Sequence, residues 1–563
     1  MTKKNLRKVS LGLAAAMALT TLSGCSGGGN TAKETEKATE KAATETTQAA
    51  GGEKTDAPAE TEAAAEATTY PIQTDESLVY WGPLNSNVSA NFTNLGDTEI
   101  GKQWQEQVGV KIEFQHPTTG QDKEQFNLII ADGNYPDLWD YNWLDANVYP
   151  GGAAKAIEDG IILELNDLFD KYCPNIKAYL EANPDMDQAI KTDDGKYFAF
   201  PAIRESDNLC TSMGPMMRAD WLKECGLEAP ETIDEWHTAL TAFKDKMGAV
   251  APFTWNNQSY VQDIPIAYAY NTPKQFIIDD GKVVYGPAKP EYKDYLKTMN
   301  QWYKEGLIDQ DVFSTGDDQT LAKMTSGRSG ATVAWCGSGL QNYTTTGRTS
   351  DPNYELVGLK WPVLNKGDKP ENGHIDNRYY YGGIAIGATC KNPELAAKVL
   401  DYGYGEEGHM MFNFGKEGVS YNMVDGYPTY TDEILNNPDG WSIAQAMGKH
   451  IMACYQGPMI QDIAYQDQYF QLPEAKAAVK NWADSNARAH KLPTITPSQE
   501  ESSEFASIMN DIGTYVDEMT SKFILGTEDI DAKFDDYIST INKMGLDRAV
   551  EIEQAAYERY QQR

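Results

Sequence analysis

The sequence has few of the residues on which enzymes and metal sites depend. Its 563 residues include only six histidines, and none stands in an HExxH or HxH arrangement. From residue 71 onward there is no GxSxG nucleophile elbow, and the chain has no GxxxxGK[ST] phosphate loop. The seven cysteines form no CxxC or CxxH pair, which argues against a zinc or redox centre. We therefore expect no catalysis, no cofactor and no bound metal.

The cysteines and one acidic segment each allow two interpretations. Six cysteines follow Cys25, and they either form three disulfides, for which there are 15 pairings, or remain buried thiols. The segment NPDMDQAIKTDDG begins like a calcium loop with Asp185 and Asp187, but Ala189 stands at the next ligand position and no glutamate follows at position twelve. We interpret it as a surface turn.

Positive charge is also scarce. The formal net charge is −35, and removal of the four basic residues near the N-terminus, in a segment without acids, leaves about −39. Nucleic acid and anionic lipid would both repel such a chain. We expect neither as a partner of the folded part.

Long hydrophobic runs are absent as well, apart from one short segment near the start. Lys3, Lys4, Arg7 and Lys8 precede an apolar stretch over residues 9–22, which is shorter than the roughly 20 residues that a membrane-spanning helix needs. The pattern predicts an export signal over residues 1–24 rather than an anchor helix.

The residues around Cys25 carry a second signal. Leu22-Ser23-Gly24-Cys25 resembles the lipobox of bacterial lipoproteins, in which the cysteine becomes the acylated first residue of the mature chain. The alternative is an ordinary secretory signal with an incidental cysteine. Lipidation at Cys25 would hold the protein on the outer face of the cell membrane.

Residues 25–70 have the composition of a linker. Alanine, threonine, glutamate, glycine and lysine dominate, and no aromatic residue precedes Tyr70. Such a segment cannot bury enough apolar surface to fold. About 490 residues remain, enough for two or more lobes.

Strand and helix signals alternate through this remaining part. Residues 77–81 and 110–114 are short strand-like runs, and the helix over 123–132 is expected to stop at Gly133. Thr232 and Glu235 form a capping box, while Asn392 and Pro393 start another helix. A buried strand is expected within 330–339, and helices dominate the last 120 residues. The rhythm indicates an α/β fold with a largely parallel sheet in the first lobe.

Flat rings recur beside amides and arginines in loop-like segments. Examples are YWGPLNSN, WDYNWLDANVYPGG, TWNNQSY, NRYYYGG and FNFGKEGVSYN. Trp and Tyr provide stacking faces for sugars, and Asn or Arg provides hydrogen-bonding groups for hydroxyls. The competing interpretation is that most of these rings belong to the core.

From Tyr80 to about Asn422 the chain resembles the large carbohydrate-type solute-binding proteins of bacterial ABC importers. The matching segments, in order, are LNSNVS, ADGNYPDL, YPGGAAKAIEDGIILELNDL, DDGKYFAFP, MRADWLKECGLEAPETIDEW, YKEGLIDQD, NPELAAKVLDYGYGEEG and FGKEGVSY. The resemblance implies a two-lobe periplasmic-binding-protein-like fold of type II, with a hinge between the lobes and a helix-rich C-terminal region. We expect lobe I over 71–200, lobe II over 201–330, a return to lobe I over 331–395 and a helical second part of lobe II over 396–563. Alginate-binding relatives carry a calcium loop that is not visible in this sequence.

The resemblance also places residues around a solute in a cleft between the lobes. Rings are expected to stack on sugar faces, and amides and guanidinium groups to bind hydroxyls or a carboxylate. The candidates are Asn85, Asn142, Trp143, Tyr149, Arg204, Arg218, Trp255, Trp335, Tyr379 and Tyr380.

These signals together predict a monomeric lipoprotein that binds an oligosaccharide and passes it to the transmembrane subunits of an ABC permease. The alternatives are a binder of peptide or another polar solute, and a tethered carbohydrate-active enzyme.

Overall fold

The computed structural model describes residues 67–563, except 145–147, 258–263, 380–381 and 453–456. The predicted signal, Cys25, the linker as far as residue 66, Tyr380 and Cys454 lie outside the described residues. Within these residues the side chains pack into two large hydrophobic cores, each around its own sheet. No helix in this part of the chain is long and apolar enough to cross a bilayer.

The first core forms around a four-stranded sheet in the order β10-β3-β1-β2. Strand β1 (Ser77–Trp81) pairs in parallel with β2 (Lys111–Gln115) and β3 (Leu138–Asp140), and β10 (Ile384–Ile386) runs antiparallel to β3. The prediction of β1 is confirmed, and the strand predicted at 110–114 lies one residue later. The apolar residues of β2 alternate toward the core, as in a half-buried strand, whereas the consecutive Tyr80 and Trp81 of β1 are both buried.

Helices cover this sheet, and several begin or end where the sequence predicts. Helix α3 stops at Gly133, whose φ is +74°, and Asn392 caps α14 by accepting a hydrogen bond from Leu395 N. The helices with side chains in this core are α2 (Glu99–Val108), α3 (Asp122–Asp132), α4 (Gly152–Glu158), α5 (Asn166–Tyr172), α6 (Pro174–Ala182), α7 (Pro184–Ala189), α14 (Pro393–Asp401), α15 (Glu406–Phe414), α16 (Asp432–Leu435) and α17 (Ile443–His450). The short α1 (Ser86–Ser89) contacts α17.

The second core forms around an antiparallel three-stranded sheet in the order β8-β5-β9. The strands are β5 (Met213–Arg218), β8 (Ala331–Trp335) and β9 (Leu356–Gly358). The buried strand predicted within 330–339 is confirmed as β8. Its glycine-rich end turns directly into one helical segment (Cys336–Gln341), where a Cβ at Gly339 would lie 2.5 Å from Ala334 Cβ.

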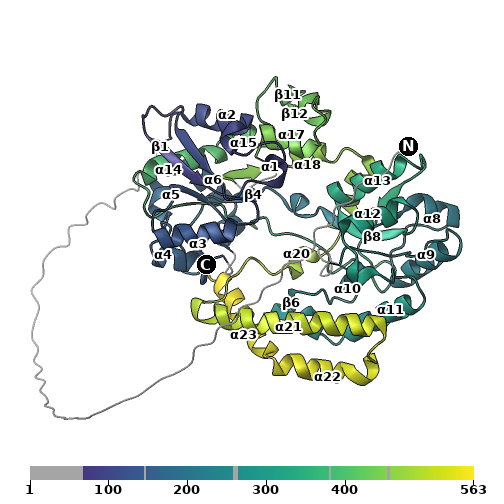
Figure 1. Cartoon of the computed structure of the whole chain (residues 1–563). Helices are drawn as coiled ribbons and strands as arrows, with labels where there is room; N and C mark the ends of the chain where they lie inside the picture. The colour runs from purple at the N-terminus through teal and green to yellow at the C-terminus, as the bar shows by residue number, and fades with distance from the viewer. Residues whose placement is uncertain (1–66, 145–147, 258–263, 380–381, 453–456) are drawn as a thin grey trace, which may run out of the picture. The chain divides into compact units, whose positions relative to one another are not determined.

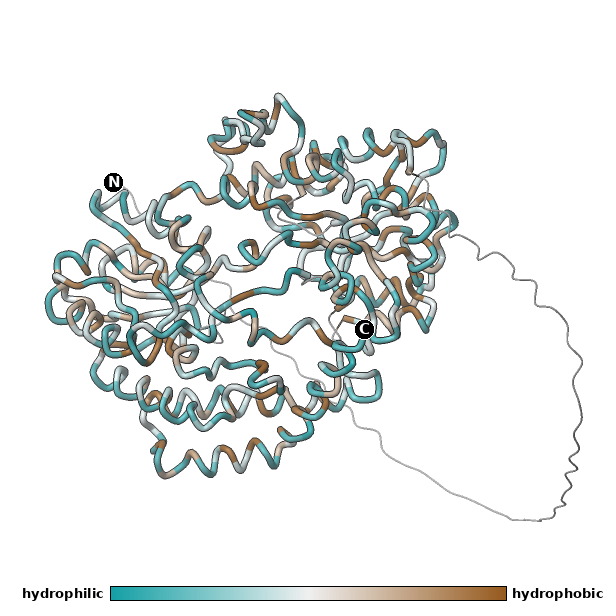
Figure 2. Tube along the Cα trace, turned by 180° about the vertical axis from the view of Figure 1, so that it is seen from behind, coloured by the Kyte–Doolittle hydropathy of each residue, from teal (hydrophilic) through white to brown (hydrophobic). Residues whose placement is uncertain are grey.

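Helices with buried faces pack into the second core. Figure 2 shows hydrophobic and hydrophilic residues alternating along the C-terminal helices, as expected for helices with one buried face. The predicted capping box of Thr232 and Glu235 is present at the start of α9. The helices are α8 (Ala219–Cys225), α9 (Ile233–Asp245), α10 (Pro265–Ala269), α11 (Tyr292–Lys304), α12 (Asp317–Thr325), α13 (Asn342–Arg348), α19 (Pro473–Ala483), α21 (Gln499–Leu525), α22 (Ile530–Lys543) and α23 (Leu546–Tyr560) (Figure 1).

The two cores divide the chain differently from the lobe boundaries expected at 331 and 396. Strand β8 belongs to the second core, and the segment from Leu395 to Tyr465 shares the first core. The reason is local: α14 follows β10 closely and packs its apolar face, with Leu395, Val399 and Leu400, back onto the same core.

Three segments of the chain meet where it crosses between the cores. Strand β4 (Ala202–Arg204) pairs in parallel with β13 (Met459–Gln461), and Tyr379 bridges to Ile203. Helix α18 (Ile463–Tyr469) follows β13, and Tyr469 packs against residues of both cores.

Two hairpins complete the described strands. They are β6 (Phe276–Asp279) with β7 (Lys282–Tyr285), and β11 (Tyr421–Val424) with β12 (Tyr427–Tyr430). Gln468 of α18 accepts a hydrogen bond from Tyr430 N and donates one to Pro428 O. The crossing helix therefore holds the second hairpin. The short α20 (Ala487–His490) lies beside β6.

Candidate functional site

Polar side chains gather where the crossing segments meet. Arg204, at the end of β4, donates from Nη1 to Asp376 Oδ2 at 2.9 Å. His374 Nε2 lies 3.5 Å from Asp376 Oδ1. Burial alone would raise the pKa of Asp376, but the hydrogen bond from His374 and the charge of Arg204 hold it well below its ordinary value. Asp376 is therefore a carboxylate that lies between the Arg204 guanidinium and the His374 ring.

Trp335 extends this group of side chains toward the second core. It is the last residue of β8 and is only half-buried. The centre of its ring lies 5.4 Å from that of His374, and the two rings meet edge to face at 83°. A flat apolar surface thus stands next to the Arg204–Asp376 pair.

Arg378 and Glu205 complete the group. Arg378 donates to the backbone oxygens of Arg204 and Glu205 at 2.9 and 2.7 Å. Glu205 Oε1 accepts from Ile463 N at 2.7 Å, at the start of α18. Burial raises the pKa of the Glu205 carboxyl. We refer to Arg204, Glu205, Trp335, His374, Asp376 and Arg378 as the crossing cluster.

Sequence reasoning anticipated Arg204 and Trp335 but missed the other members of the cluster. A signal for them exists, because His374, Asp376 and Arg378 alternate with the uncharged Ile375 and Asn377 at a spacing of two. In an extended segment that spacing places all three side chains on one face.

The two predicted asparagines lie in the first lobe. Asn85 is half-buried and caps α1 by accepting from Asn87 N at 2.9 Å. Asn142 Oδ1 is buried and finds no hydrogen-bond partner among the described residues. A buried acceptor without a donor is costly, so the Asn142 amide is available to a ligand or a water molecule. Binding by either asparagine stays a prediction.

The other predicted residues of the first lobe make internal contacts. Trp143 is 1% exposed, and its Nε1 donates to Trp139 O at 3.2 Å among the rings of Phe126 and Trp139. Tyr149 donates to Asp159 Oδ2 at 2.7 Å. The Tyr379 hydroxyl donates to Gly382 O. These positions give the side chains packing partners within the lobe, and Tyr380 lies outside the described residues.

Arg218 is held within the second core. It is 3% exposed, makes two hydrogen bonds to Asp220 at 2.8 and 2.5 Å, and lies over the rings of Trp221 and Tyr354. A guanidinium group with these partners stabilises the packing of α8 against the sheet. Among the described residues, the Arg218 side chain makes no hydrogen bond, ion pair or ring contact with the crossing cluster.

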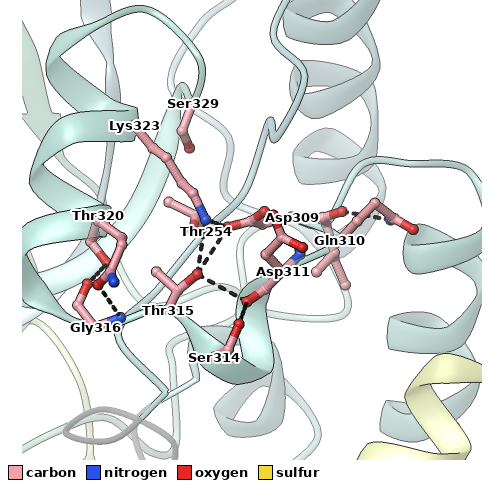
Figure 3. Close-up of polar contacts among 12 residues, drawn as sticks. Thr254, Asp309, Gln310, Asp311, Ser314, Thr315, Gly316, Thr320, Lys323 and Ser329 are labelled. Atoms are coloured by element: carbon pink, nitrogen blue, oxygen red, sulfur yellow. Dashed lines mark hydrogen bonds and ion pairs between the residues drawn. The ribbon is translucent and has the colours of Figure 1, made fainter. Parts of the chain in front are cut away.

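Trp255 lies in a loop that a buried ion pair positions. Lys323 Nζ and Thr254 Oγ1 both donate to Asp309 Oδ2, at 2.5 and 2.7 Å (Figure 3). Burial would raise the pKa of Asp309, but these hydrogen bonds hold it below its ordinary value. The next residue, Trp255, is 1% exposed, and its Nε1 donates to Asn257 Oδ1 at 3.2 Å. The network therefore fixes the TWNN loop, while a ligand contact by Trp255 stays a prediction.

The segment that begins like a calcium loop forms helix α7 and the turn after it. Asp185 pairs with Arg378, Asp187 with Lys191, and Asp193 with Arg559. Each carboxylate is thus engaged by its own cation. Among the described residues, no group of three or more His, Cys, Asp or Glu side chains is placed to hold a metal ion.

A separate cavity of about 380 Å³ lies beside this turn. Its walls include Trp143, Lys191, Asp193, Thr496 and Arg563. Lys191 and Arg563 are each paired with an aspartate, Asp187 and Asp193 respectively. None of the crossing-cluster residues lines this cavity, so the two places are distinct.

Comparison with known proteins places this geometry in a family. The model of the bacterial extracellular solute-binding proteins matches residues 89–410, which is more than half of the chain. The chain belongs to this family. Family members of this kind bind solutes rather than transform them, and the two cores joined by crossing segments are the two lobes of that fold.

Three similar proteins illustrate the range of the family. The fructooligosaccharide ABC transporter substrate-binding protein FusA of Streptococcus pneumoniae serotype 4 is 25% identical over 525 residues, covering 88% of this chain and 93% of FusA. Lipoprotein LipO of Bacillus subtilis is 22% identical and covers 76% of this chain and 80% of its own length. The crystal structure of alginate-binding protein AlgQ2 without calcium ion has a TM-score of 0.67 at 24% identity, covering 88% of this chain and all of AlgQ2. The last likeness shows the fold.

Proposed function

We propose that the protein captures a carbohydrate outside the cell membrane and delivers it unchanged to the transmembrane subunits of an ABC importer. The observation that carries the proposal is the crossing cluster, in which the half-buried Trp335 stands beside the Arg204–Asp376 pair. A ring face next to fixed donors and acceptors suits a sugar, which presents apolar C–H surfaces and hydroxyl groups. Asn85, Asn142 and Tyr380 are further candidates for hydroxyl contacts.

The names of the relatives support a sugar as the solute. FusA is named for fructooligosaccharides and AlgQ2 for alginate. Fructooligosaccharides are uncharged and alginate is a polyanion, so the names leave the charge of the ligand open.

The same proposal includes attachment to the membrane. Cys25 follows a lipobox-like segment, and the relative LipO is named a lipoprotein. We infer that acyl chains on Cys25 anchor a monomer, and that residues 25–70 act as its tether. Metabolic labelling with a fatty acid should mark the wild-type protein but not Cys25→Ala.

Calorimetry with a panel of oligosaccharides tests the solute. We expect one or more sugars to bind, and Trp335→Ala to weaken that binding by roughly tenfold or more through loss of stacking. Tyr303→Ala removes another half-buried ring, from α11 in the same lobe, and should leave the affinity unchanged.

The outcomes separate the parts of the proposal. If no mono- or oligosaccharide binds, the carbohydrate assignment is lost. If a sugar binds equally well to Trp335→Ala, the crossing cluster is not the site. If chromatography after incubation shows cleaved sugar, the protein is not a carrier alone.

A further inference from the structure

The charged groups of the crossing cluster already have partners. Arg204 pairs with Asp376 at 2.9 Å, and His374 approaches the other oxygen of that carboxylate. Arg378 pairs with Asp185 at 3.2 Å, and it also donates hydrogen bonds to the Tyr179 hydroxyl and to backbone oxygens. The guanidinium groups beside Trp335 are therefore neutralised within the protein.

The next shell of side chains repeats this pattern. Arg488 binds both oxygens of Asp207, at 3.1 and 2.6 Å, and also donates to Asp376 O at 2.9 Å. His409 lies 3.0 Å from Asp462. Glu205 accepts a hydrogen bond from Ile463 N, and the charges of His409 and Arg378 oppose the rise of its pKa. The arginines of this region thus already have carboxylate partners.

We propose that this site selects uncharged oligosaccharides and rejects oligomers of uronic acids. The inference rests on the proposed function and specifies its substrate class. A uronate carboxylate would need a guanidinium group of its own, and recruiting Arg204 would leave Asp376 without that cation and close to a second carboxylate. Both changes are costly in a partly buried site.

An uncharged sugar meets no such obstacle. A carboxylate that accepts a hydrogen bond from Arg204 at one oxygen still has lone pairs for a sugar hydroxyl. Glu205 can accept from a hydroxyl in the same way, and Trp335 needs only an apolar ring face. The net charge of −35 adds a long-range repulsion of polyanions, which salt would screen.

Calorimetry with matched pairs of sugars tests the proposal. The probes are uncharged fructo-, gluco- and galacto-oligosaccharides, and uronic-acid oligomers of equal length from pectin and alginate. We expect a member of the uncharged set to bind at least about a hundredfold more tightly than any uronic-acid oligomer. Equal or tighter binding of a uronic-acid oligomer overturns the inference but leaves the carbohydrate-carrier function intact. Failure of both sets overturns the proposed function itself.

A variant tests the role assigned to Asp376. Asp376→Asn removes the carboxylate that neutralises Arg204, and we expect it to raise the affinity for uronic-acid oligomers by about tenfold or more. Asp531→Asn also removes one negative charge from an ion-paired aspartate, but on α22, where it contacts Lys293 and Lys297. Asp531→Asn should leave the affinity for uronic-acid oligomers unchanged.

The Asp531→Asn control also tests whether overall charge, rather than Asp376, causes the rejection of uronic-acid oligomers. An equal gain in both variants would assign the rejection to overall charge, and no gain in a folded Asp376→Asn protein would remove Asp376 from the mechanism. Either result overturns the assignment. If circular dichroism shows that Asp376→Asn does not fold, the comparison of matched sugars on the wild-type protein still decides.

Discussion

Asp140 is the clearest example of a single residue in an unfavourable setting. It ends β3 in the first core and is 3% exposed. Tyr80 donates to Oδ2 at 2.7 Å, while Oδ1 has no hydrogen-bond partner among the described residues. Burial raises the pKa of this carboxyl to about 7, and the Tyr80 hydrogen bond only partly opposes that shift.

This raised pKa predicts a pH-dependent stability. The folded state favours the protonated acid, so the contribution of Asp140 is fully present below the ordinary pKa of 3.8 and is lost as pH rises through about 7. Asp140→Asn keeps an acceptor for Tyr80 without the charge. As the pH rises from 4 to 8, the unfolding free energy of the variant minus that of the wild type should increase by roughly 2–4 kcal/mol.

Urea denaturation at a series of pH values measures this difference. Asp167→Asn removes an exposed carboxylate and should follow the wild-type profile. Parallel profiles for Asp140→Asn and wild type would show that Asp140 is not buried as an acid.

At the residue scale the sequence predicts which types of side chain a site needs, but not which of them face it. Trp143, Trp255 and Trp335 all stand beside loop-forming residues, yet the first two are almost fully covered and only Trp335 is half-buried. The difference arises from packing, because Trp143 lies among the rings of Phe126 and Trp139 and Trp255 lies against Phe253. Arg204 and Arg218 also differ in burial, because Asp220 and Tyr354 enclose the Arg218 side chain but not that of Arg204.

At the scale of elements, the buried pair Lys323–Asp309 joins helix α12 to two loops of the second lobe. Asp309 also accepts from Thr254, and Lys323 donates to Thr315 (Figure 3). Lys323→Met would leave a buried carboxylate without its cation. We expect a loss of about 3–5 kcal/mol in unfolding free energy at neutral pH.

The pH dependence of this loss has a definite sign. The pKa of Asp309 is lowered in the folded state, so its contribution is present above the ordinary value of 3.8 and disappears as pH falls through the lowered value. The gap between wild type and Lys323→Met in urea denaturation should therefore narrow in acid. Lys522→Met breaks an exposed pair with Glu518 and should leave the unfolding free energy nearly unchanged. A loss as small for Lys323→Met would contradict a buried pair.

Local signals explain why helices are predicted better than loops at this scale. The capping box at Thr232, the Asn392 cap and the stop at Gly133 depend on residues within four positions of each other. The loop from Thr254 to Asn257 depends instead on Asp309, Thr315 and Lys323, which lie more than fifty positions away. No spacing within the loop reveals those partners.

At the scale of the whole molecule, helix α23 connects the two cores. Leu546 packs in the second core, and Gln554 accepts from Val283 N in β7. Further along the chain, Arg559 and Arg563 both bind Asp193 of the first lobe, at 2.6 and 2.7 Å, and Gln188 donates to Tyr560 O. Helix α23 thus starts in the second lobe, and the chain at its C-terminal end contacts the first lobe.

Removing the two arginines should release this end of the helix. In Arg559→Ala/Arg563→Ala we expect faster hydrogen–deuterium exchange in residues 186–194 and 555–563, and a loss of about 1 kcal/mol in unfolding free energy. Arg548→Ala breaks pairs with Glu501 and Glu504 within the second lobe and should leave exchange at 186–194 unchanged. Unchanged exchange in the double variant would mean that Asp193 does not hold the helix.

The number of lobes follows from length and from the rhythm of the elements, whereas their boundaries do not. Helix α14 packs on the first core, and the contacts of its apolar face, rather than any local pattern, reveal that. Only Arg204 and Trp335 of the crossing cluster were predicted, for a related reason. Its members come from three segments: Trp335 lies 130 residues after Glu205, and His374 lies 39 residues after Trp335. The alternation of helices and strands does not predict where these segments meet.

The junction between the lobes is built mainly from the backbone. Arg204 N donates to Arg378 O, Glu205 N donates to Gln461 O, and β4 pairs with β13. Bonds between peptide groups do not depend on which side chains surround them. Mutations can therefore alter the side chains of the crossing cluster while the backbone junction between the lobes is inherited unchanged, so the surface of the cluster and the connection between the lobes can evolve independently.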